Sequence, residues 1–417
     1  MTSLGQDQDQ DQVRTRIRGE GPLGGVRILE LGSLIAGPFA TRLLADFGAE
    51  VIKVEAPGRG DPMRGWGAAR SEGRSLWWPI QTRGKKLITL DLRNTRGQAL
   101  CRELASQCDV LVENFRPGTM ERWGLGPEEL AAVHPRLIYT RVSGYGQTGP
   151  YSSRGGFASA GEAMAGLRHL GGFPGEAPPR TGLSLGDSLS ALFATIGILT
   201  ALYERDTVSG EGQVVDASIL ESCFAMLESI APEFDRLGAV RQPTGTRITN
   251  NAPSNIYRSR DEKWVVIAAN SDSLWPRLAE AMGRAELAGD ERFATHDARG
   301  VNEDELDTII GAWAAEHDAR TIDRLLDAAG VVCSPVNTIA DVFADEHVQA
   351  RGMLVPVHDE ELGELRGPGI VPKLSRTPGR SEFRSTWTAG ADTTAVFGEL
   401  LGLDEAACEE LSGEGVI

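Results

Sequence analysis

The sequence has few of the features that mark metal, disulfide or secreted proteins. Its 417 residues include only five cysteines and six histidines. The cysteines are scattered and never paired as C-x-x-C, and the histidines never form H-E-x-x-H. The N-terminus lacks the apolar core of a signal peptide. We therefore expect reduced thiols, a cytoplasmic location, and neither a metal site nor a disulfide framework.

Positive charge and long apolar runs are also scarce. A formal net charge of −17 disfavours nucleic acid and anionic membranes as general partners, although a local basic patch can still bind a small polyanion. The uncharged run over residues 188–203 is shorter than the roughly 20 residues that span a bilayer, and it contains serine, threonine and glycine. We interpret it as a core helix rather than a membrane segment.

The length and the local composition of the sequence predict two domains preceded by a tail. With 41% hydrophobic residues the chain can build a large core. Residues 1–20 include a polar Asp-Gln repeat and are expected to be a disordered tail. We expect a large domain over residues 21–225, a smaller α+β domain over 226–335, and a return to the large domain over 336–417.

The large domain alternates strand and helix patterns, which predicts an α/β fold with a doubly wound parallel sheet. We expect further helices over 274–282, 303–313 and 321–328, after a hairpin formed by 256–258 and 264–268. The elements expected in the first half are strands 26–31, 51–55, 87–90, 110–113 and 137–142, with helices 38–47 and 98–106 and a short helix beginning at 127.

Loops after these strands are the expected ligand edge of the sheet. Glu55 ends the second strand where dinucleotide-binding proteins hold a ribose, but the preceding loop lacks G-x-G-x-x-G and Pro38 removes an amide donor. A nucleotide-binding module without turnover stays an alternative. Basic residues in these stretches fit a phosphorylated ligand; they are Arg64, Arg70, Arg83, Lys85, Lys86, Arg93, Arg116 and Arg122.

Asp187 stands where the long apolar helix begins, which makes it the candidate for chemistry. Backbone N–H groups and the helix dipole favour an anion at that position. The alternative is a simple N-cap, since aspartate is among the commonest caps. Behind it, a buried helical face is expected from the spacing of Leu189, Leu192, Phe193, Ile196, Leu199 and Tyr203. The sequence contains no serine nucleophile elbow, P-loop or kinase signature.

Six motifs in this order resemble the class III CoA-transferases, a family that includes formyl-CoA and carnitine CoA-transferases and the 2-methylacyl-CoA racemases. The likeness extends over nearly the whole chain from Gly25. The motifs are Arg27-Ile28-Leu29-Glu30-Leu31 with Ala36-Gly37-Pro38, the segment from Phe47 to Glu55, Glu113 to Gly118, Ser143 to Pro150, Gly186-Asp187, and Gly212 to Ser218.

The resemblance implies a Rossmann-like large domain built from both ends of the chain, with a small domain inserted between them. It implies a homodimer whose two subunits are interlocked like chain links. It makes Asp187 the catalytic nucleophile and a coenzyme A thioester the substrate, with no permanently bound cofactor. The residues implied to bind CoA are Ala36, Leu90, Arg93, Asn114, Phe115, Arg116 and Arg122.

Two departures narrow the implied activity. Ile35 replaces a glutamine of formyl-CoA transferases, which disfavours formate and oxalate as substrates. Phe157 stands where the racemases have a histidine base, so proton exchange at an α-carbon lacks half its machinery. We therefore expect CoA transfer from an acyl-CoA to a free carboxylic acid, with a racemase or epimerase as the alternative. Glu162 and the surrounding segment resemble relatives that use succinyl-CoA, and Trp66, Trp77, Trp78 and Arg70 are candidates for an acyl pocket.

Overall fold

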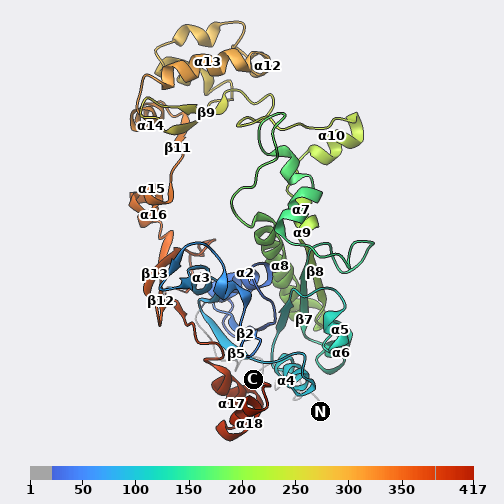
Figure 1. Cartoon of the computed structure of the whole chain (residues 1–417). Coiled ribbons are helices and arrows are strands. Elements are labelled where there is room, and N and C mark those ends of the chain that lie inside the picture. The colour runs from blue at the N-terminus through green and yellow to red at the C-terminus, as the bar shows by residue number, and fades with distance from the viewer. Residues whose placement is uncertain (1–20, 381) are drawn as a thin grey trace, which may run out of the picture. The chain divides into compact units, whose positions relative to one another are not determined.

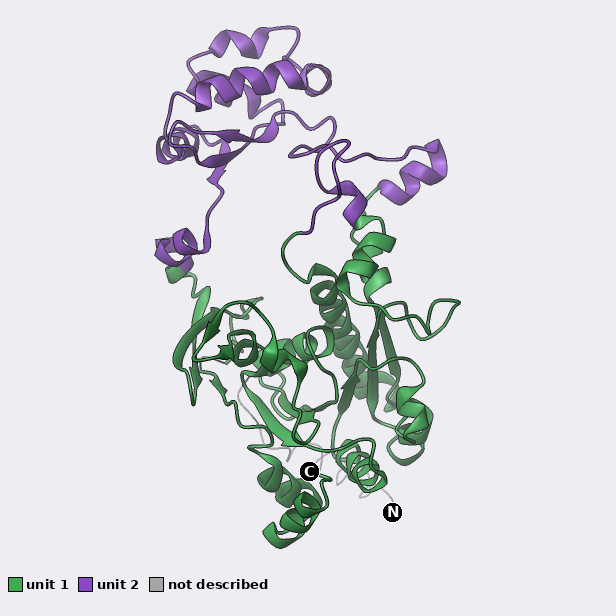
Figure 2. Ribbon diagram, in the orientation of Figure 1, with its two compact units in different colours: residues 1–167, 181–229, 349–417 green, residues 168–180, 230–348 purple. Residues whose placement is uncertain are grey.

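The computed structural model describes residues 21–380 and 382–417, so the tail expected over residues 1–20 lies outside the described part. Two compact units share the chain (Figure 2). Unit 1 combines the segments up to residue 167, 181–229 and 349–417, and unit 2 combines 168–180 with 230–348. The small domain was expected to begin at residue 226 and the return to the large domain at residue 336; in the structure these boundaries lie at residues 230 and 349. The segment 168–180 belongs to unit 2, although the sequence analysis placed it in the large domain.

A six-stranded parallel sheet forms the centre of unit 1, as the strand and helix alternation predicts (Figure 1). In spatial order the strands are β5 (Lys85–Thr89), β2 (Glu50–Glu55), β1 (Arg27–Glu30), β6 (Val110–Glu113), β7 (Ile138–Ser143) and β8 (Val214–Ser218). The direction in which successive strands are added reverses between β1 and β6, which makes this the expected position of a ligand crevice. Strand β8 was not predicted, because it is a half-exposed edge strand without a buried apolar run.

Helices cover both faces of this sheet. On one face α2 (Ala36–Asp46) and α8 (Leu185–Glu204) pack on strand residues such as Ile28 and Val51. On the other face strand residues such as Leu29 and Ile52 join a core with α4 (Thr95–Ser106), α6 (Pro127–Val133), α17 (Thr393–Leu401) and α18 (Glu405–Gly413). Successive strand residues alternate between the two cores, as the pleat requires.

The buried face of α8 differs from the expected one. The helix packs on α2 through Ala191, Ala194 and Ile198, which are fully buried. Small residues allow the two helices to approach closely, so the larger side chains turn outward. Leu192, Ile196, Leu199 and Tyr203, here called the α8 stripe, are 41–69% exposed. The expectation that these four residues are buried is wrong for the single chain. Among the described residues, one helical segment, Leu185–Ser209, is long and apolar enough to cross a membrane, by length and composition alone.

The rest of unit 1 consists of short elements around the sheet. They are η1 (Pro62–Gly65), β3 (Arg70–Ser71), β4 (Arg74–Ser75), α3 (Trp77–Thr82), α5 (Thr119–Arg122), α7 (Ala158–Met164), η3 (Arg205–Ser209), α9 (Ile219–Phe224), β12 (Leu354–Asp359), β13 (Gly363–Pro368) and β14 (Arg384–Ser385). Strands β13, β12 and β14 form a separate small sheet. Helix η2 (Leu167–Leu170) crosses from unit 1 into unit 2, and α16 (Glu346–Ala350) crosses back.

Unit 2 is a small α+β unit with its own core. Its antiparallel sheet has the order β11 (Val332–Pro335), β10 (Trp264–Ala268), β9 (Ser254–Arg258), and the pairing of Trp264 with Arg258 confirms the predicted hairpin. Trp275 and Phe293 pack edge to face inside the core. The helices are α10 (Ile230–Leu237), α11 (Trp275–Ala281), η4 (Ala285–Gly289), α12 (His296–Val301), α13 (Glu303–Ala314), α14 (Ala319–Ala328) and α15 (Ile339–Ala344).

Candidate active site

Asp187 lies in the first turn of α8, inside the helix rather than at its cap. The N-cap position belongs to Ser184, whose side chain makes no capping hydrogen bond. The N-cap alternative for Asp187 is therefore wrong by three positions. The side chain is partly buried, and the unpaired N–H groups of the first turn stabilise a carboxylate there. The sequence placed the helix start two residues too late because Leu185 and Gly186 carry no start signal.

Gly186 allows the start of α8 to approach two other helices closely. A Cβ at this position would lie 2.9 Å from Cγ2 of Ile219 and 3.0 Å from the carbonyl oxygen of Ala158, so a larger residue would push α8 away from α9 and α7. The N–H of Gly186 donates to Oε1 of Glu162 at 3.0 Å. The Gly-Asp pair thus fixes Asp187 at the junction of three helices.

A second carboxylate and a thiol lie beside Asp187. Glu162 on α7 is 4% exposed and Cys223 on α9 is fully buried. Burial, and then the negative charges of Glu162 and Asp187, raise the pKa of the Cys223 thiol to about 11. The Cys223 thiol is therefore neutral near pH 7. No group of three His, Cys, Asp or Glu side chains in the described ranges could hold a metal ion.

The crevice between β1 and β6 is closed by a two-bond clamp. Asn114, directly after β6, accepts from the N–H of Ser33 at 2.9 Å and donates to the carbonyl oxygen of Ser33 at 2.8 Å. The next residue, Leu34, has a φ of +64°, and its N–H donates to Asp61 at 3.1 Å. The loop before α2 is thus held in an unfavourable backbone conformation by side chains from other segments of unit 1, which is common at functional loops.

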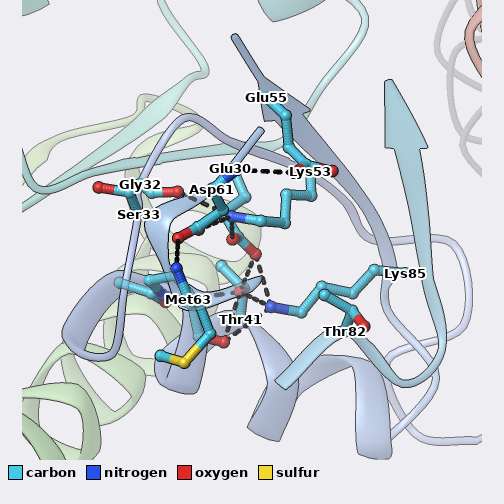
Figure 3. A network of polar contacts seen from close by, with 12 residues as sticks. Glu30, Gly32, Ser33, Thr41, Lys53, Glu55, Asp61, Met63, Thr82 and Lys85 are labelled. Atoms are coloured by element: carbon cyan, nitrogen blue, oxygen red, sulfur yellow. Dashed lines mark hydrogen bonds and ion pairs between the residues drawn. The ribbon is translucent and has the colours of Figure 1, made fainter. Parts of the chain in front are cut away.

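A buried network of charged side chains holds this loop in place (Figure 3). Nζ of Lys53 lies 2.8 Å from both Glu30 and Asp61 and donates to the carbonyl oxygen of Gly32 at 2.9 Å. Lys85 reaches the other oxygen of Glu30 at 2.7 Å. Burial opposes the charge on Glu30, but Lys53 and Lys85 outweigh it and lower the pKa of Glu30 to about 2. Burial and the charge of Lys53 lower the pKa of Lys85 to about 8, although Glu30 acts against them.

A cavity of about 290 Å³, here called the switch-point cavity, opens at the same edge of the sheet. Three of the residues implied to bind CoA line it: Leu90, Arg93 and Phe115. Asn114 forms the adjacent clamp, and Ala36 is buried in the first turn of α2. Arg116 and Arg122 are exposed and lie outside the lining of this cavity. The structure therefore brings five of the seven residues to one region and leaves these two arginines at its periphery.

A second cavity of about 640 Å³, here called the Ser188 cavity, is lined in part by Ile35, directly before α2, and by Phe39 and Arg42 of α2. Ser188 follows Asp187 directly in the sequence and lines this cavity together with Trp77. Trp78 is fully buried and donates to the carbonyl oxygen of Thr386 at 2.9 Å, so it does not shape an acyl pocket. Trp66 packs edge to face on Trp77, with ring centroids 6.2 Å apart.

Several basic residues expected at the ligand edge serve the interior instead. Arg83 is fully buried and makes two bonds to Asp46, at 2.9 and 2.6 Å. Lys85 belongs to the network of Figure 3, and Lys86 pairs with glutamates at 2.6 and 3.1 Å. Arg83 precedes β5, and Lys85 and Lys86 are its first two residues, so all three lie at the amino end of the strand, away from the ligand edge. Their expected role in binding phosphate is wrong.

Glu55 is also engaged within unit 1. Its carboxylate accepts from Arg64 at 2.8 and 2.7 Å and from the N–H of Asp61 at 2.8 Å. A ribose would have to displace these bonds, which argues against the dinucleotide alternative. Arg64 in turn stacks on the Trp78 ring at 3.8 Å. The sequence pattern correctly placed Glu55 at the end of its strand, but it did not predict that Arg64 and Asp61 bind the Glu55 carboxylate.

The glycine loop over residues 143–150 is shaped by its own hydrogen bonds. The N–H of Gly146 donates to Oγ of Ser143 at 3.0 Å, and the N–H of Gln147 donates to Asp216 at 2.9 Å. These two amides are therefore not available to an oxyanion. Gly146 has a φ of +85°, which glycine adopts without strain.

The sequence reasoning missed the charge network and the interior neighbours of Asp187. Glu30 and Lys53 are single charges inside otherwise apolar strands, and that pattern is a usable signal of a buried pair. Cys223 and Arg42, another residue of the Ser188 cavity, gave no such signal, because only the packing of helices brings them to the site.

Comparisons with known proteins show the family to which the chain is similar. The sequence profile of the family described as CoA-transferase family III matches residues 23–393. The chain is 51% identical to a succinyl-CoA–D-citramalate CoA-transferase of Chloroflexus aurantiacus, covering 95% of this chain and 98% of the relative. It is 42% identical to the alpha subunit of a succinyl-CoA–L-malate CoA-transferase of Chloroflexus aurantiacus, covering 95% and 92%. It is 33% identical to the succinyl-CoA:glutarate CoA-transferase of Homo sapiens, covering 95% and 90%.

A solved structure agrees with the fold. The crystal structure of a CAIB/BAIF family protein from Brucella suis superimposes with a TM-score of 0.81 at 33% identity, covering 91% of this chain and 100% of that one. The similarity extends over both units of the chain.

Proposed function

Because the chain belongs to CoA-transferase family III, we propose that it moves CoA from succinyl-CoA to a second small dicarboxylic acid through covalent intermediates on Asp187. The three relatives described above are named for succinyl-CoA and for citramalate, malate or glutarate. The observation that supports the proposal best is the position of Asp187, in the first turn of α8 and next to a residue that lines a large cavity.

The first half-reaction exchanges one activated acyl bond for another. An oxygen of Asp187 attacks the thioester carbon, the carbon–sulfur bond breaks, and an acyl-aspartyl anhydride and CoA thiolate form. The thiolate then attacks the carbonyl carbon of Asp187. The anhydride bond breaks, the first carboxylic acid leaves, and an aspartyl-CoA thioester remains.

The second half-reaction repeats these steps in the opposite direction with the acceptor. The acceptor carboxylate attacks the aspartyl-CoA thioester and forms a new anhydride with Asp187, which releases the thiolate. The thiolate attacks the acyl carbon of the acceptor and regenerates the free carboxylate of Asp187. Anhydride and thioester are similarly activated, so each step is nearly balanced and needs no outside energy source.

The binding of CoA is proposed at the switch-point cavity. Leu90, Arg93 and Phe115 line it, the Asn114 clamp borders it, and Ala36 begins the helix behind the loop. We assign the adenine and ribose phosphate end to this edge, with Arg116 and Arg122 as exposed cations at the periphery. The pantetheine arm then extends past the loop before α2 towards Asp187.

Stabilisation of the tetrahedral oxyanion is assigned to the start of α8. The amides of Gly146 and Gln147 are engaged, so the glycine loop supplies neither of them. The positive end of the α8 dipole lies at Asp187 itself and favours negative charge as it develops.

A racemase of the same family is the second candidate. It would need a base beside the α-carbon, and Phe157 stands at the position implied for that base. Phe157 is 68% exposed at the N-cap of α7 and offers no titratable group. Together with three relatives named as CoA-transferases, this favours transfer.

The protein is also proposed to act as an interlocked homodimer in the cytoplasm. The α8 stripe supports the dimer, because four large apolar side chains at helical spacing are left uncovered in one chain. The five cysteines are free thiols, in keeping with a reducing compartment. The relatives named as alpha and beta subunits make a hetero-oligomer the alternative assembly.

The test of the proposal is a covalent adduct on one peptide. We expect mass spectrometry after incubation with succinyl-CoA to find an acyl or CoA adduct on the peptide containing Asp187, and hydroxylamine to convert it to a hydroxamate. Asp187→Ala should lack the adduct and all transfer. Asp297→Ala is the matched control, since Asp297 is an exposed aspartate in the first turn of α12. Proton exchange at the α-carbon in heavy water without an adduct would support the racemase instead.

A further inference from the structure

The Ser188 cavity is large, mostly apolar, and contains a single charge. Its volume of about 640 Å³ lies within the usual range for small-molecule sites. Ile35, Phe39, Trp77 and Ile80 contribute apolar surface to its wall. Arg42 is the one charged residue among the described residues that line it. A wall of this kind with one cation is suited to an apolar ligand that carries one anionic group.

Arg42 is a buried cation with unused bonding capacity. It is 6% exposed, and its Nε has no hydrogen-bond partner within the described residues. Burial lowers the pKa of Arg42 to about 10, opposed by Asp46 and assisted by Arg83. The carboxylate of Asp46 already makes two bonds to Arg83, at 2.9 and 2.6 Å. Arg42 thus lacks a carboxylate of its own.

The other buried cations in the described part of the chain have hydrogen-bond or ion-pair partners, which makes Arg42 unusual. Lys53 pairs with two carboxylates at 2.8 Å. Arg299 in unit 2 is fully buried and makes four hydrogen bonds of 2.8–3.1 Å. The guanidinium of Arg42 instead lies 4.6 Å from the centre of the Phe39 ring, a contact that fixes its plane without satisfying its donors. A buried donor without a partner is costly unless a ligand completes it.

We propose that Arg42 binds the distal carboxylate of a dicarboxylic acyl group whose other end reacts at Asp187. This rests on the proposed function and names the residue that would select its substrate class. The planar guanidinium can hold a carboxylate through two parallel bonds. Ser188 connects the cavity to Asp187 by one peptide bond, so an acyl chain that reacts at Asp187 can extend along the apolar wall towards Arg42.

The physical consequence is discrimination between dicarboxylic and monocarboxylic acyl groups. Succinyl-CoA and butyryl-CoA have the same chain length and differ only in that a carboxylate replaces a methyl group. With butyryl-CoA, the Nε of Arg42 stays buried without a hydrogen-bond partner, as it is in the free protein. Sites built to bind a charged or polar group reject the analogue that lacks it by two or more orders of magnitude.

The experiment compares the rates at which the two thioesters form the Asp187 adduct. We expect wild type to prefer succinyl-CoA by at least about 100-fold, and Arg42→Gln to lose most of that preference. Arg42→Lys should keep part of it, because a lysine supplies the charge but not the planar fork. Arg320→Gln, at an exposed arginine of α14, is the matched control and should keep the wild-type ratio.

Each outcome decides one of the two proposals. An Arg42→Gln protein that folds and keeps the wild-type ratio overturns the role of Arg42 and leaves the CoA-transferase intact. Absence of any adduct on wild type overturns the proposed function. If Arg42→Gln does not fold, calorimetry on wild type decides, because succinate should bind and butyrate should not. Equal binding of the two acids, or none of either, overturns the proposal.

Discussion

At the scale of single residues, unit 1 places charge in its interior for two purposes. Glu30, Lys53 and Asp61 neutralise one another and hold the loop before α2. Arg42 instead lines the Ser188 cavity, and its Nε has no hydrogen-bond partner among the described residues. Buried networks of the first kind rigidify a structure only when every member is satisfied. Removing one member of the network should therefore disturb the conformation of the loop before α2 and also lower the stability of the fold.

Glu30→Gln tests the network through its pH dependence. The folded pKa of Glu30, about 2, lies below its ordinary value of 4.5, so its contribution is present above pH 4.5 and is lost as the pH falls towards 2. The shift corresponds to a free energy of unfolding on the order of 3 kcal/mol. We expect urea denaturation to detect a wild-type stability that falls more steeply than that of Glu30→Gln between these pH values. Glu128→Gln, at an exposed glutamate, should follow wild type, and parallel curves for all three proteins would refute the role of the network.

At the scale of elements, the two faces of α8 have different surroundings, since one packs on α2 and the other is exposed. Its small residues pack against α2 and bring Asp187 to the junction with α7 and α9. Its large residues form the exposed α8 stripe. A helix that is apolar on all sides is expected to be buried on all sides, so the uncovered face needs another surface.

Charge placed in the α8 stripe should impair assembly of the dimer as the protein folds, while leaving the secondary structure of each chain in place. Ile196→Glu puts a carboxylate into a face that we propose is buried between subunits, and an unpaired buried charge is strongly destabilising. Light scattering at micromolar concentration should detect a smaller species or aggregation for Ile196→Glu, with far-UV circular dichroism close to wild type. Val301→Glu, at a residue that is 84% exposed on α12, should stay dimeric. An unchanged Ile196→Glu dimer would remove α8 from the interface.

At the scale of the whole molecule, the chain leaves unit 1 twice, to supply residues 168–180 and 230–348 to unit 2, and returns each time. The last segment, residues 349–417, supplies Val396 and Phe397 to the same core as Leu29 in β1. Neither end of the chain can complete unit 1 alone. Such a path is compatible with the interlocked dimer that we propose.

Interlocked subunits should exchange only through unfolding. We expect no heterodimer when a His-tagged and an untagged dimer are mixed for a day and purified on nickel, because separation would require one chain to unthread. Refolding the same mixture from urea should yield about half heterodimer by random pairing. Rapid exchange in native buffer would contradict interlocking while leaving an ordinary dimer possible.

The local elements and the family could be predicted from the sequence alone. The parallel sheet followed from apolar strands that alternate with helix patterns, and the hairpin of unit 2 followed from two strand patterns and a turn. Asp187 was found because a charge at the end of a long uncharged run is visible in one dimension. These features depend on residues that are close together in the sequence, so they can be predicted from its periodicity and composition.

Which side chains lie close together depends on the tertiary structure. It assigned Arg83 and Lys85 to internal pairs instead of a phosphate site, because their partners Asp46 and Glu30 come from other elements. It turned the large residues of α8 outward, because α2 requires a close approach. It also left Arg42 beside a cavity without a carboxylate of its own. The sequence does not encode such distances locally, since they arise when segments far apart in the chain pack together.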